Sequence, residues 1–421
     1  MDESLLKSEE KAVFALRSLY RRYGYLPFRM SKFEEYELYI RNKDFLVSDR
    51  IITFNDTNGR LLALKPDVTL SIIKSGEDRP GFKQKVYYNE NVYRVSESTH
   101  QYKEIMQAGL ECIGDIDLYD IYEVITLAAE SLSLISEDFV LEISHLGLLS
   151  AVLDKICPDK AFADKAIHFI SEKNVHDLQE LCRQHGIGER ETEALSVFVT
   201  AYGERGKVVD ALESVWGDGL RGGFRTRLRE GKSRLSDEEP QALGEGSWLS
   251  GEESQVLGEE SRLSDEEPQL SRCLAELKAL SRLLEGSAFS ERIRFDFSVV
   301  NDMNYYNGFV FKGFLAGICG GVLAGGQYDK MMARMDRGSG AVGFAIYLDL
   351  LEQLRQERAG YDVDVLLVYD SGTASHVVAG KVRELIASGR SVTAQKTIPE
   401  KLRYREILDL REEKDMTQMG R

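Results

Sequence analysis

The stretch 85–114, KVYYNENVYRVSESTHQYKEIMQAGLECIG, contains two β-prone runs joined by a polar loop. In the second run, Gln107, Gly109 and Glu111 alternate with apolar residues, so they lie on one face of a strand. Glycine leaves space between the two polar side chains. We expect this face to bind a small zwitterion that carries an amine and an imidazole. The alternative is a solvent-facing strand with scattered polar groups. It is favoured when each polar residue is considered alone, but not when they are considered together and in this order.

Strand signals also surround this stretch on both sides. DRIITFNDTNGRLLALKP, residues 49–66, has two β-prone runs joined by the turn signal D-T-N-G, which predicts a hairpin. A third strand group is indicated by FDFSVVND from 295, YYNGFVFKGFLAGI from 305 and GGVLAGGQYD from 320. Hairpin-linked strands with helices at the edges predict an α+β fold built on an antiparallel sheet.

The remaining segments predict four regions along the chain. Residues 150–285 are expected to form a helical insertion between core halves at 1–149 and 286–358, and glycine ends one helix near Gly186. Residues 359–421 begin with a β-α-β pattern, which predicts a short α/β unit, and their basic tail is expected to add a helix.

Inside the insertion, residues 233–274 repeat with a period of 14: SRLSDEEPQALGEG, SWLSGEESQVLGEE, SRLSDEEPQLSRCL. A period of two heptads raises the possibility of a coiled coil. Glycine, serine and proline interrupt each unit, and few apolar residues are available to offset the ordering entropy. The repeat is therefore predicted to be disordered, with a helix leading out of it.

Composition narrows the class of protein. Residues 233–268 hold eleven acids and two bases, so this stretch supplies more than half of the net charge of −16. The acidic net charge argues against tRNA binding without excluding it, because contacts to phosphate need lysine and arginine. The five scattered cysteines form no C-x-x-C, so neither a metal site nor a disulfide framework is expected, and the location is expected to be cytoplasmic. No secretion signal or membrane span is indicated.

Further polar residues occur where strands should be apolar. Asp67 and Thr69 follow LALKP, and Arg94 lies in NVYRV. Tyr305 and Tyr306 open the run YYNGFVF. Together with Gln107 and Glu111, they form the set of candidate binding residues.

The order of these motifs resembles class II histidyl-tRNA synthetases and their regulatory paralogues. GRLLALKPDVTLSI is similar to the family's G-R-x-L-A-L-R-P-E-x-T, and the stretch 85–114 to motif 2 and the following Q-x-G-x-E strand. NDMNYYNGFVF is similar to R-G-L-D-Y-Y-x-G-x-V-F, and GGQYD to G-G-R-Y-D. The resemblance implies that the candidate set Asp67, Thr69, Arg94, Gln107, Glu111, Tyr305 and Tyr306 binds histidine.

Departures from the family pattern concern the chemistry on ATP. The arginine of R-G-L-D-Y-Y is Asn301 here, and the arginine of motif 3 is Leu350. Tyr347 replaces a motif 3 glycine. Each lost arginine removes a cation that would stabilise the developing charge on phosphate. The resemblance therefore implies amino-acid binding without adenylation.

The leading expectation is a non-catalytic regulatory subunit. The resemblance implies a catalytic partner, the short form of ATP phosphoribosyltransferase, which performs the first step of histidine synthesis and is activated by the paralogue. Feedback by histidine and a homodimer within a hetero-oligomer belong to the same expectation, and no cofactor is expected. The alternatives are a divergent histidyl-tRNA synthetase and an unrelated transferase acting on another amino acid.

Overall fold

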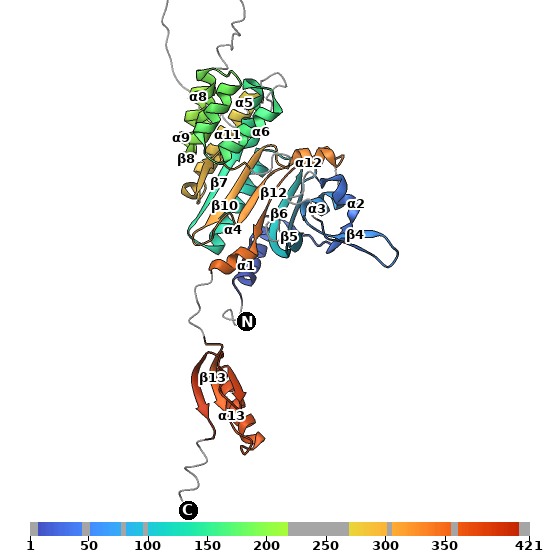
Figure 1. Cartoon of the computed structure of the whole chain (residues 1–421), viewed down its shortest axis with the longest axis vertical. Coiled ribbons are helices and arrows are strands. Elements are labelled where there is room, and N and C mark those ends of the chain that lie inside the picture. The colour runs from blue at the N-terminus through green and yellow to red at the C-terminus, as the bar shows by residue number, and fades with distance from the viewer. Residues whose placement is uncertain are drawn as a thin grey trace, which may run out of the picture. The chain divides into compact units, whose positions relative to one another are not determined.

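The computed structural model describes residues 7–43, 51–76, 81–95, 100–217, 269–300, 305–354 and 361–411. The chain forms two compact units, Met1–Leu354 and Arg355–Arg421 (Figure 1). Within the described residues, no helix is both long and apolar enough to cross a membrane.

A nine-stranded sheet with the order β1-β5-β6-β12-β11-β10-β7-β9-β8 forms the centre of the first unit. Its strands are β1 (Leu26–Pro27), β5 (Gln84–Val95), β6 (Tyr102–Gly114), β7 (Phe139–His145), β8 (Tyr202–Gly203), β9 (Ile293–Asp296), β10 (Phe309–Leu315), β11 (Leu323–Gln327) and β12 (Gly340–Tyr347). Pairing is antiparallel throughout the middle of the sheet, and parallel only where β1 meets β5 and β7 meets β9. The predicted antiparallel α+β sheet is confirmed.

The longest pair of strands is β5 and β6, which the sequence predicted from the stretch 85–114. Their register runs from Gln84 opposite Ile113 to Val95 opposite Tyr102. The alternation of small and polar residues on β6 therefore places Gln107, Gly109 and Glu111 on one face, as expected.

Two helices cover the other face of this sheet. They are α1 (Ser8–Arg22) and α4 (Leu118–Ile135). Asp117 caps α4 by accepting hydrogen bonds from the backbone of Tyr119 and Asp120. Apolar residues of both helices, such as Leu16 and Leu132, are buried against the sheet in the larger hydrophobic core.

On the face with Glu111, a smaller layer packs over one end of the sheet. It consists of α2 (Tyr36–Arg41), α3 (Thr69–Ser75), α12 (Asp329–Arg334) and a three-stranded sheet of β2 (Phe33–Glu35), β4 (Leu61–Leu64) and β3 (Thr53–Asn55). Its buried residues, including Tyr39, Leu70 and Met331, form a second core. Strands β3 and β4 are the predicted hairpin, and Gly59 takes a positive φ of 79° in its turn.

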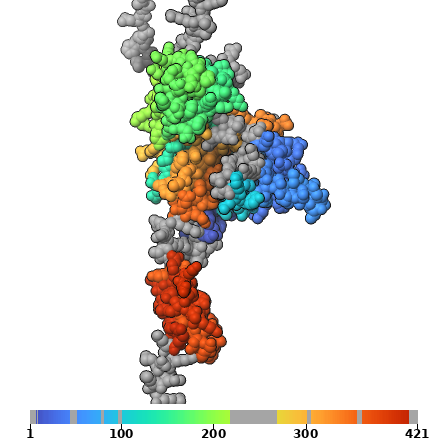
Figure 2. All heavy atoms as spheres, viewed as in Figure 1, coloured from blue at the N-terminus to red at the C-terminus, as the bar shows by residue number. Residues whose placement is uncertain are grey.

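Helices dominate the segment between β7 and β9, as the sequence predicted. They are α5 (Leu146–Ile156), α6 (Lys160–Ser171), α7 (Val175–Gln184), α8 (Glu189–Thr200), α9 (Arg205–Leu212) and α11 (Gln269–Glu285), with a π-helical turn η3 (Glu213–Gly217) and a 3-10 turn η4 (Ser290–Arg292). Gly186 follows α7 with a φ of 67°, as expected for a helix-ending glycine. Figure 2 shows the green part of this segment as a lobe distinct from the blue N-terminal part.

The predicted disordered repeat, 233–274, lies outside the described residues as far as 268. Its last six residues, 269–274, are helical, so the prediction of disorder is wrong for them. They begin helix α11, which confirms the helix predicted to lead out of the repeat. Leu270, Cys273 and Leu274 are buried in the larger core. In the third repeat unit these apolar residues recur at helical spacing, and burial offsets the ordering entropy.

The second unit is a parallel three-stranded sheet with the order β14-β13-β15. Its elements are β13 (Val363–Val368), α13 (Ser375–Ala387), β14 (Val392–Gln395) and β15 (Tyr404–Asp409). The β-α-β prediction is confirmed. The helix expected in the tail, 401–421, is wrong for residues 404–409, which form β15 and pair with the second edge of β13. Residues 412–421 of that prediction lie outside the described residues.

Candidate functional site

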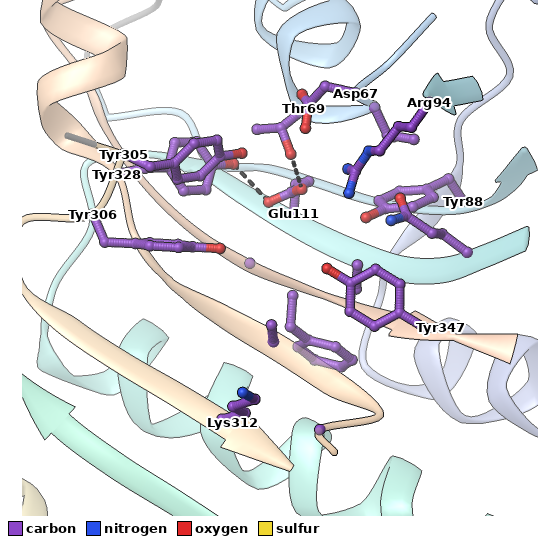
Figure 3. Close-up of a pocket in the computed structure, with 17 residues that line it drawn as sticks. Asp67, Thr69, Tyr88, Arg94, Glu111, Tyr305, Tyr306, Lys312, Tyr328 and Tyr347 are labelled. Atoms are coloured by element: carbon purple, nitrogen blue, oxygen red, sulfur yellow. Dashed lines mark hydrogen bonds between the residues drawn. The ribbon is translucent and has the colours of Figure 1, made fainter. Parts of the chain in front are cut away.

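A cavity of about 440 Å³ lies on the sheet face that carries Glu111 (Figure 3). The structure brings all seven candidate residues around it, from segments that are up to 239 positions apart. These residues are Asp67, Thr69, Arg94, Gln107, Glu111, Tyr305 and Tyr306. Thr69 is the first residue of α3, Asp67 lies two residues before it, and Arg94 lies near the end of β5.

Glu111 is held by two hydroxyl donors. Thr69 Oγ1 donates to Glu111 Oε1 over 2.8 Å, and the Tyr328 hydroxyl donates to Oε2 over 2.6 Å. The side chain is 2% exposed, and burial raises the pKa of its carboxyl to about 8. A positively charged ligand group beside Glu111 would favour the ionised form of its carboxyl and lower its pKa.

A glycine on the neighbouring strand β12 makes room for the Glu111 side chain. Gly343 of β12 lies opposite Glu111, and a Cβ atom on it would come within 1.7 Å of Glu111 Oε2. The side chain of Glu111 therefore crosses the space above Gly343. No other residue type leaves that space free.

Gly109 has a different role from the expected one. The sequence predicted an empty space between Gln107 and Glu111. In the structure, Tyr88 lies opposite Gly109, and a Cβ atom on Gly109 would come within 2.6 Å of the Tyr88 hydroxyl. The space is filled by this tyrosine, because a long side chain on the paired strand can lean over a glycine.

Asp67 and Arg94 lie together at the α3 end of the cavity. Asp67 Oδ1 accepts a hydrogen bond from the backbone N–H of Leu70 over 2.9 Å, and Arg94 Nε donates to the Pro66 carbonyl over 3.0 Å. Burial raises the pKa of the Asp67 carboxyl above its ordinary value. The nearby Arg94 guanidinium offsets part of this increase. One acid and one base thus stand side by side, an arrangement that suits an ammonium and a carboxylate on the same ligand.

Tyrosines form a wall on the side of Glu111 that faces away from Arg94 (Figure 3). The rings of Tyr305 and Tyr306 are 4.5 Å apart, and those of Tyr305 and Tyr328 are 5.9 Å apart. Burial raises the pKa of Tyr305 and Tyr328 well above its usual value, so both hydroxyls stay protonated and can donate. An aromatic wall of this kind can pack against a flat ring of a ligand.

The sequence did not single out four further lining residues as binding residues: Tyr88, Lys312, Tyr328 and Tyr347. Tyr328 lies within GGQYD, a motif already noted, so it could have been found. Tyr347 had been noted only as a replacement for glycine. Lys312 gave a usable signal too, because it is a charged residue within the apolar run FVFKGF.

The structure describes one of the two positions at which this chain lacks a family arginine. Leu350, in the 3-10 helix η5 (Leu348–Leu354), packs against the larger hydrophobic core and offers no charge. Asn301 lies outside the described residues. Among the described residues that line the cavity, Arg94 and Lys312 carry a positive charge.

His145, Cys273 and Glu276 form a second cluster, with potential ligand atoms within 4.8 Å of one another. His145 Nδ1 accepts the backbone N–H of Leu148 over 3.0 Å and so caps α5. Its Nε2 is therefore the protonated nitrogen, and it lies 3.3 Å from Glu276 Oε2. Both nitrogens of the ring are engaged, so this arrangement is a helix cap supported by an acid rather than a metal site.

Comparisons with known proteins agree with this architecture. The family model described as histidyl-tRNA synthetase matches residues 1–230 and 225–351. A relative from Clostridium novyi (strain NT), named ATP phosphoribosyltransferase regulatory subunit, is 24% identical over 367 residues, which cover 84% of this chain and 75% of the relative. A relative of the same name from Clostridium kluyveri is 26% identical over 341 residues, covering 79% and 74%.

Solved structures show the same fold. A protein from Bacillus halodurans C, described as an ATP phosphoribosyltransferase regulatory subunit/histidyl-tRNA synthetase, aligns with a TM-score of 0.67 at 21% identity over 96% of this chain and 93% of that chain. A chain of the ATP phosphoribosyl transferase (HisG:HisZ) complex from Thermotoga maritima aligns with a TM-score of 0.52 at 20% identity, covering 81% and 97%. With the sheet, the cavity and a family match over more than half its length, this chain belongs to the histidyl-tRNA synthetase family.

Proposed function

We propose that this chain is a non-catalytic regulatory subunit that binds and activates a separate, short-form ATP phosphoribosyltransferase in the first step of histidine synthesis. The observation that carries the proposal is that the seven candidate residues line one cavity, while Leu350 and Asn301 carry no charge where the family has arginine. The names of the relatives support it, because both Clostridium relatives are named as regulatory subunits. The Thermotoga maritima structure supports a partner, since it is described as a complex.

The proposed lack of synthetase activity follows from the absence of two positive charges that the family's arginines supply. Adenylation requires cations that stabilise the charge developing on the phosphoryl group, and one such contact is often worth several kcal/mol. Leu350 packs on the core and carries no charge, and Asn301 is neutral. Binding of the amino acid does not need these cations, so the proposal separates binding from catalysis.

Histidine is the proposed ligand, and feedback sensing is its proposed purpose. In this proposal Glu111 and Asp67 bind the imidazole and the ammonium, and Arg94 binds the carboxylate; their positions around one cavity support it. We expect the imidazole ring to pack against the tyrosine wall, whose rings Tyr305 and Tyr306 are 4.5 Å apart. The charged groups pair with opposite charges on the ligand and fix its orientation, and the aromatic rings contact its flat ring.

The proposal also includes a homodimer within a hetero-oligomer, a cytoplasmic location and no cofactor. Its domain assignment keeps a class II core in two halves, 1–149 and 286–358, with the insertion 150–285 between them and a short anticodon-binding-like unit at 359–421. A divergent histidyl-tRNA synthetase is the second candidate, favoured by the family match itself.

Two assays separate the candidates. The purified chain is mixed with a short-form catalytic ATP phosphoribosyltransferase, and activation together with co-elution on a sizing column is the expected result. The chain alone is tested for histidine-dependent ATP–pyrophosphate exchange, which is expected to be absent. Exchange without activation would replace the proposal with the synthetase.

A further inference from the structure

Two short stretches that carry the tyrosine wall are bonded to each other. The stretch 305–309 carries two of its tyrosines, and the stretch 327–329 carries the third. The backbone N–H of Asn307 donates to the Gln327 carbonyl over 3.0 Å, and the backbone N–H of Phe309 donates to Gln327 Oε1 over 2.8 Å. The wall is therefore held by a direct connection between the start of β10 and the end of β11.

The side chain of Asn307 adds a second connection between these stretches. Its Nδ2 donates to Asp329 Oδ2 over 3.1 Å, and its Oδ1 accepts the backbone N–H of Lys330 over 3.4 Å. A side-chain amide offers a donor and an acceptor side by side, so both contacts are made in one orientation. A change that keeps the size of this side chain but removes the donor will therefore break the contact with Asp329.

Asp329 divides its two oxygens between this contact and strand β12. Oδ1 accepts the backbone N–H of Ala341 over 2.9 Å, while Oδ2 accepts from Asn307. Strand β12 also contributes Gly343, which makes room for the Glu111 side chain. One carboxylate thus connects the stretch that carries the tyrosines with the strand that adjoins Glu111.

Helix α5 leaves the stretch 305–309 little room to move. The backbone N–H of Leu146 donates to the Gly308 carbonyl over 2.9 Å, and a Cβ atom on Gly147 would come within 3.2 Å of the Asn307 carbonyl oxygen. The backbone of the stretch is therefore in close contact with the start of α5. Because packed groups have few alternative positions, the loss of the contact between Asn307 and the acid cannot be absorbed by a shift toward this helix.

We propose that Asn307 is a positioning residue for the tyrosine wall, whose bond to Asp329 fixes the wall relative to Glu111. Asn307 itself is not among the described residues that line the cavity. It acts through Tyr305 and Tyr306, and the attraction between aromatic faces depends on their separation and angle. The inference rests on the proposed histidine pocket and adds to it a residue that sets how tightly the imidazole ring is held.

The test places a like charge against Asp329 in the full-length chain. Asn307→Asp replaces the amide donor by a carboxylate at a contact that is now 3.1 Å long, so repulsion is expected to displace the stretch 305–309. Calorimetric titration is expected to show a loss of histidine affinity of about tenfold, the size of effect expected for misplaced aromatic contacts. Asp329→Asn in the same chain restores a donor–acceptor pair with the roles exchanged and leaves an oxygen for Ala341, so most of the affinity should return.

The chain offers a matched control at the start of helix α7. Asn174 Nδ2 donates to Asp177 Oδ2 over 2.8 Å, and Asn174 Oδ1 accepts the backbone N–H of Asp177 over 3.1 Å. Asn174→Asp therefore makes the same change in the same kind of contact, at a helix end that does not line the cavity. Its histidine affinity is expected to equal that of the wild type.

Hydrogen–deuterium exchange of the ligand-free proteins gives a readout that does not depend on histidine. The peptide that contains 305–309 should exchange faster in Asn307→Asp and return to the wild-type rate when Asp329→Asn is added. If the wild type binds no histidine and the exchange still follows this pattern, the proposed ligand is wrong and the positioning role of Asn307 stands. Unchanged exchange in Asn307→Asp, no recovery in the double variant, or an equal loss of affinity in Asn174→Asp would each overturn the proposal.

Discussion

The Tyr328 hydroxyl donates a 2.6 Å hydrogen bond to Oε2 of Glu111, a residue 217 positions earlier in the chain. Tyr328 directly precedes α12, and Glu111 lies near the C-terminal end of β6. The contact therefore connects the cavity floor to the layer above it. Thr69 makes the equivalent contact from α3, so both oxygens of the carboxylate are fixed by elements of the upper layer.

Tyr328→Phe removes one of these two donors without changing the shape of the ring. We expect histidine affinity to fall by about 1–2 kcal/mol, because the carboxylate loses a charge-assisted hydrogen bond and some of its fixed orientation. Calorimetric titration of histidine measures this loss. Tyr93→Phe is the control, since it removes a tyrosine–carboxylate hydrogen bond to Glu104 on the exposed surface. An equal loss in both variants would contradict a specific role for Tyr328.

Glu111→Gln keeps the shape of the side chain and removes the negative charge that the carboxyl takes on when a cationic ligand group binds. A charge-assisted hydrogen bond is worth roughly 1.5–3 kcal/mol, so the affinity for histidine is expected to fall about tenfold or more. Tyr306→Phe should have a smaller effect if its hydroxyl only shares a contact. Histidine is titrated into each protein alone and with the catalytic partner. Unchanged affinity in both settings would refute the histidine pocket and leave the regulatory assignment intact.

Stability should depend on pH through Glu111. Its pKa in the folded chain is about 8, against an ordinary value of 4.5, so between these values the folded state holds a proton that the unfolded state releases. Its contribution to the free energy of unfolding therefore decreases as the pH rises from about 4.5 to about 8. In Glu111→Gln this decrease is absent. Melting temperatures at pH 5.5 and pH 8 should show the variant gaining on the wild type at the higher pH. A constant difference would rule out the raised pKa.

Gly343→Ala tests the space above the glycine. The added methyl would lie 1.7 Å from Glu111 Oε2 and 2.5 Å from the Leu110 carbonyl, so the strand or the acid must shift. We expect a loss of about 1–3 kcal/mol in the free energy of unfolding and weaker histidine binding. Denaturant unfolding measures the first. Gly206→Ala in α9 is the control, because its methyl meets nothing within 4 Å, and it is expected to be neutral or stabilising by about 0.5–1 kcal/mol.

Deletion of residues 233–268 should leave folding and partner activation intact. This stretch has few apolar residues to contribute to a core. The deletion stops before Gln269, because helix α11 is buried against the larger core. Thermal unfolding and the activation assay provide the readouts, with a longer deletion to residue 274 as the destabilised comparison. A large fall in the melting temperature of the shorter deletion would show that the repeat is structural.

Local pattern was sufficient for much of the fold. The alternation in the stretch 85–114 predicted strands β5 and β6, and the D-T-N-G turn predicted the β3–β4 hairpin. The tail was misjudged because its residues 404–409 lack a clean alternation, and only the free edge of β13 makes them a strand. Local propensity does not register such a partner, which is distant in sequence.

For the site, the sequence by itself determined which chemical groups are available: the acids Asp67 and Glu111, the tyrosine pair and the neutral Asn301. The tertiary structure decided how they meet. Cross-strand pairing placed Gly343 beneath Glu111, Tyr88 over Gly109, and Lys312 at the far end of the same floor. The physical reason is that alternation along one strand fixes only the face on which a side chain lies. Its neighbours on that face are set by the register of the adjoining strands, a property of the folded sheet.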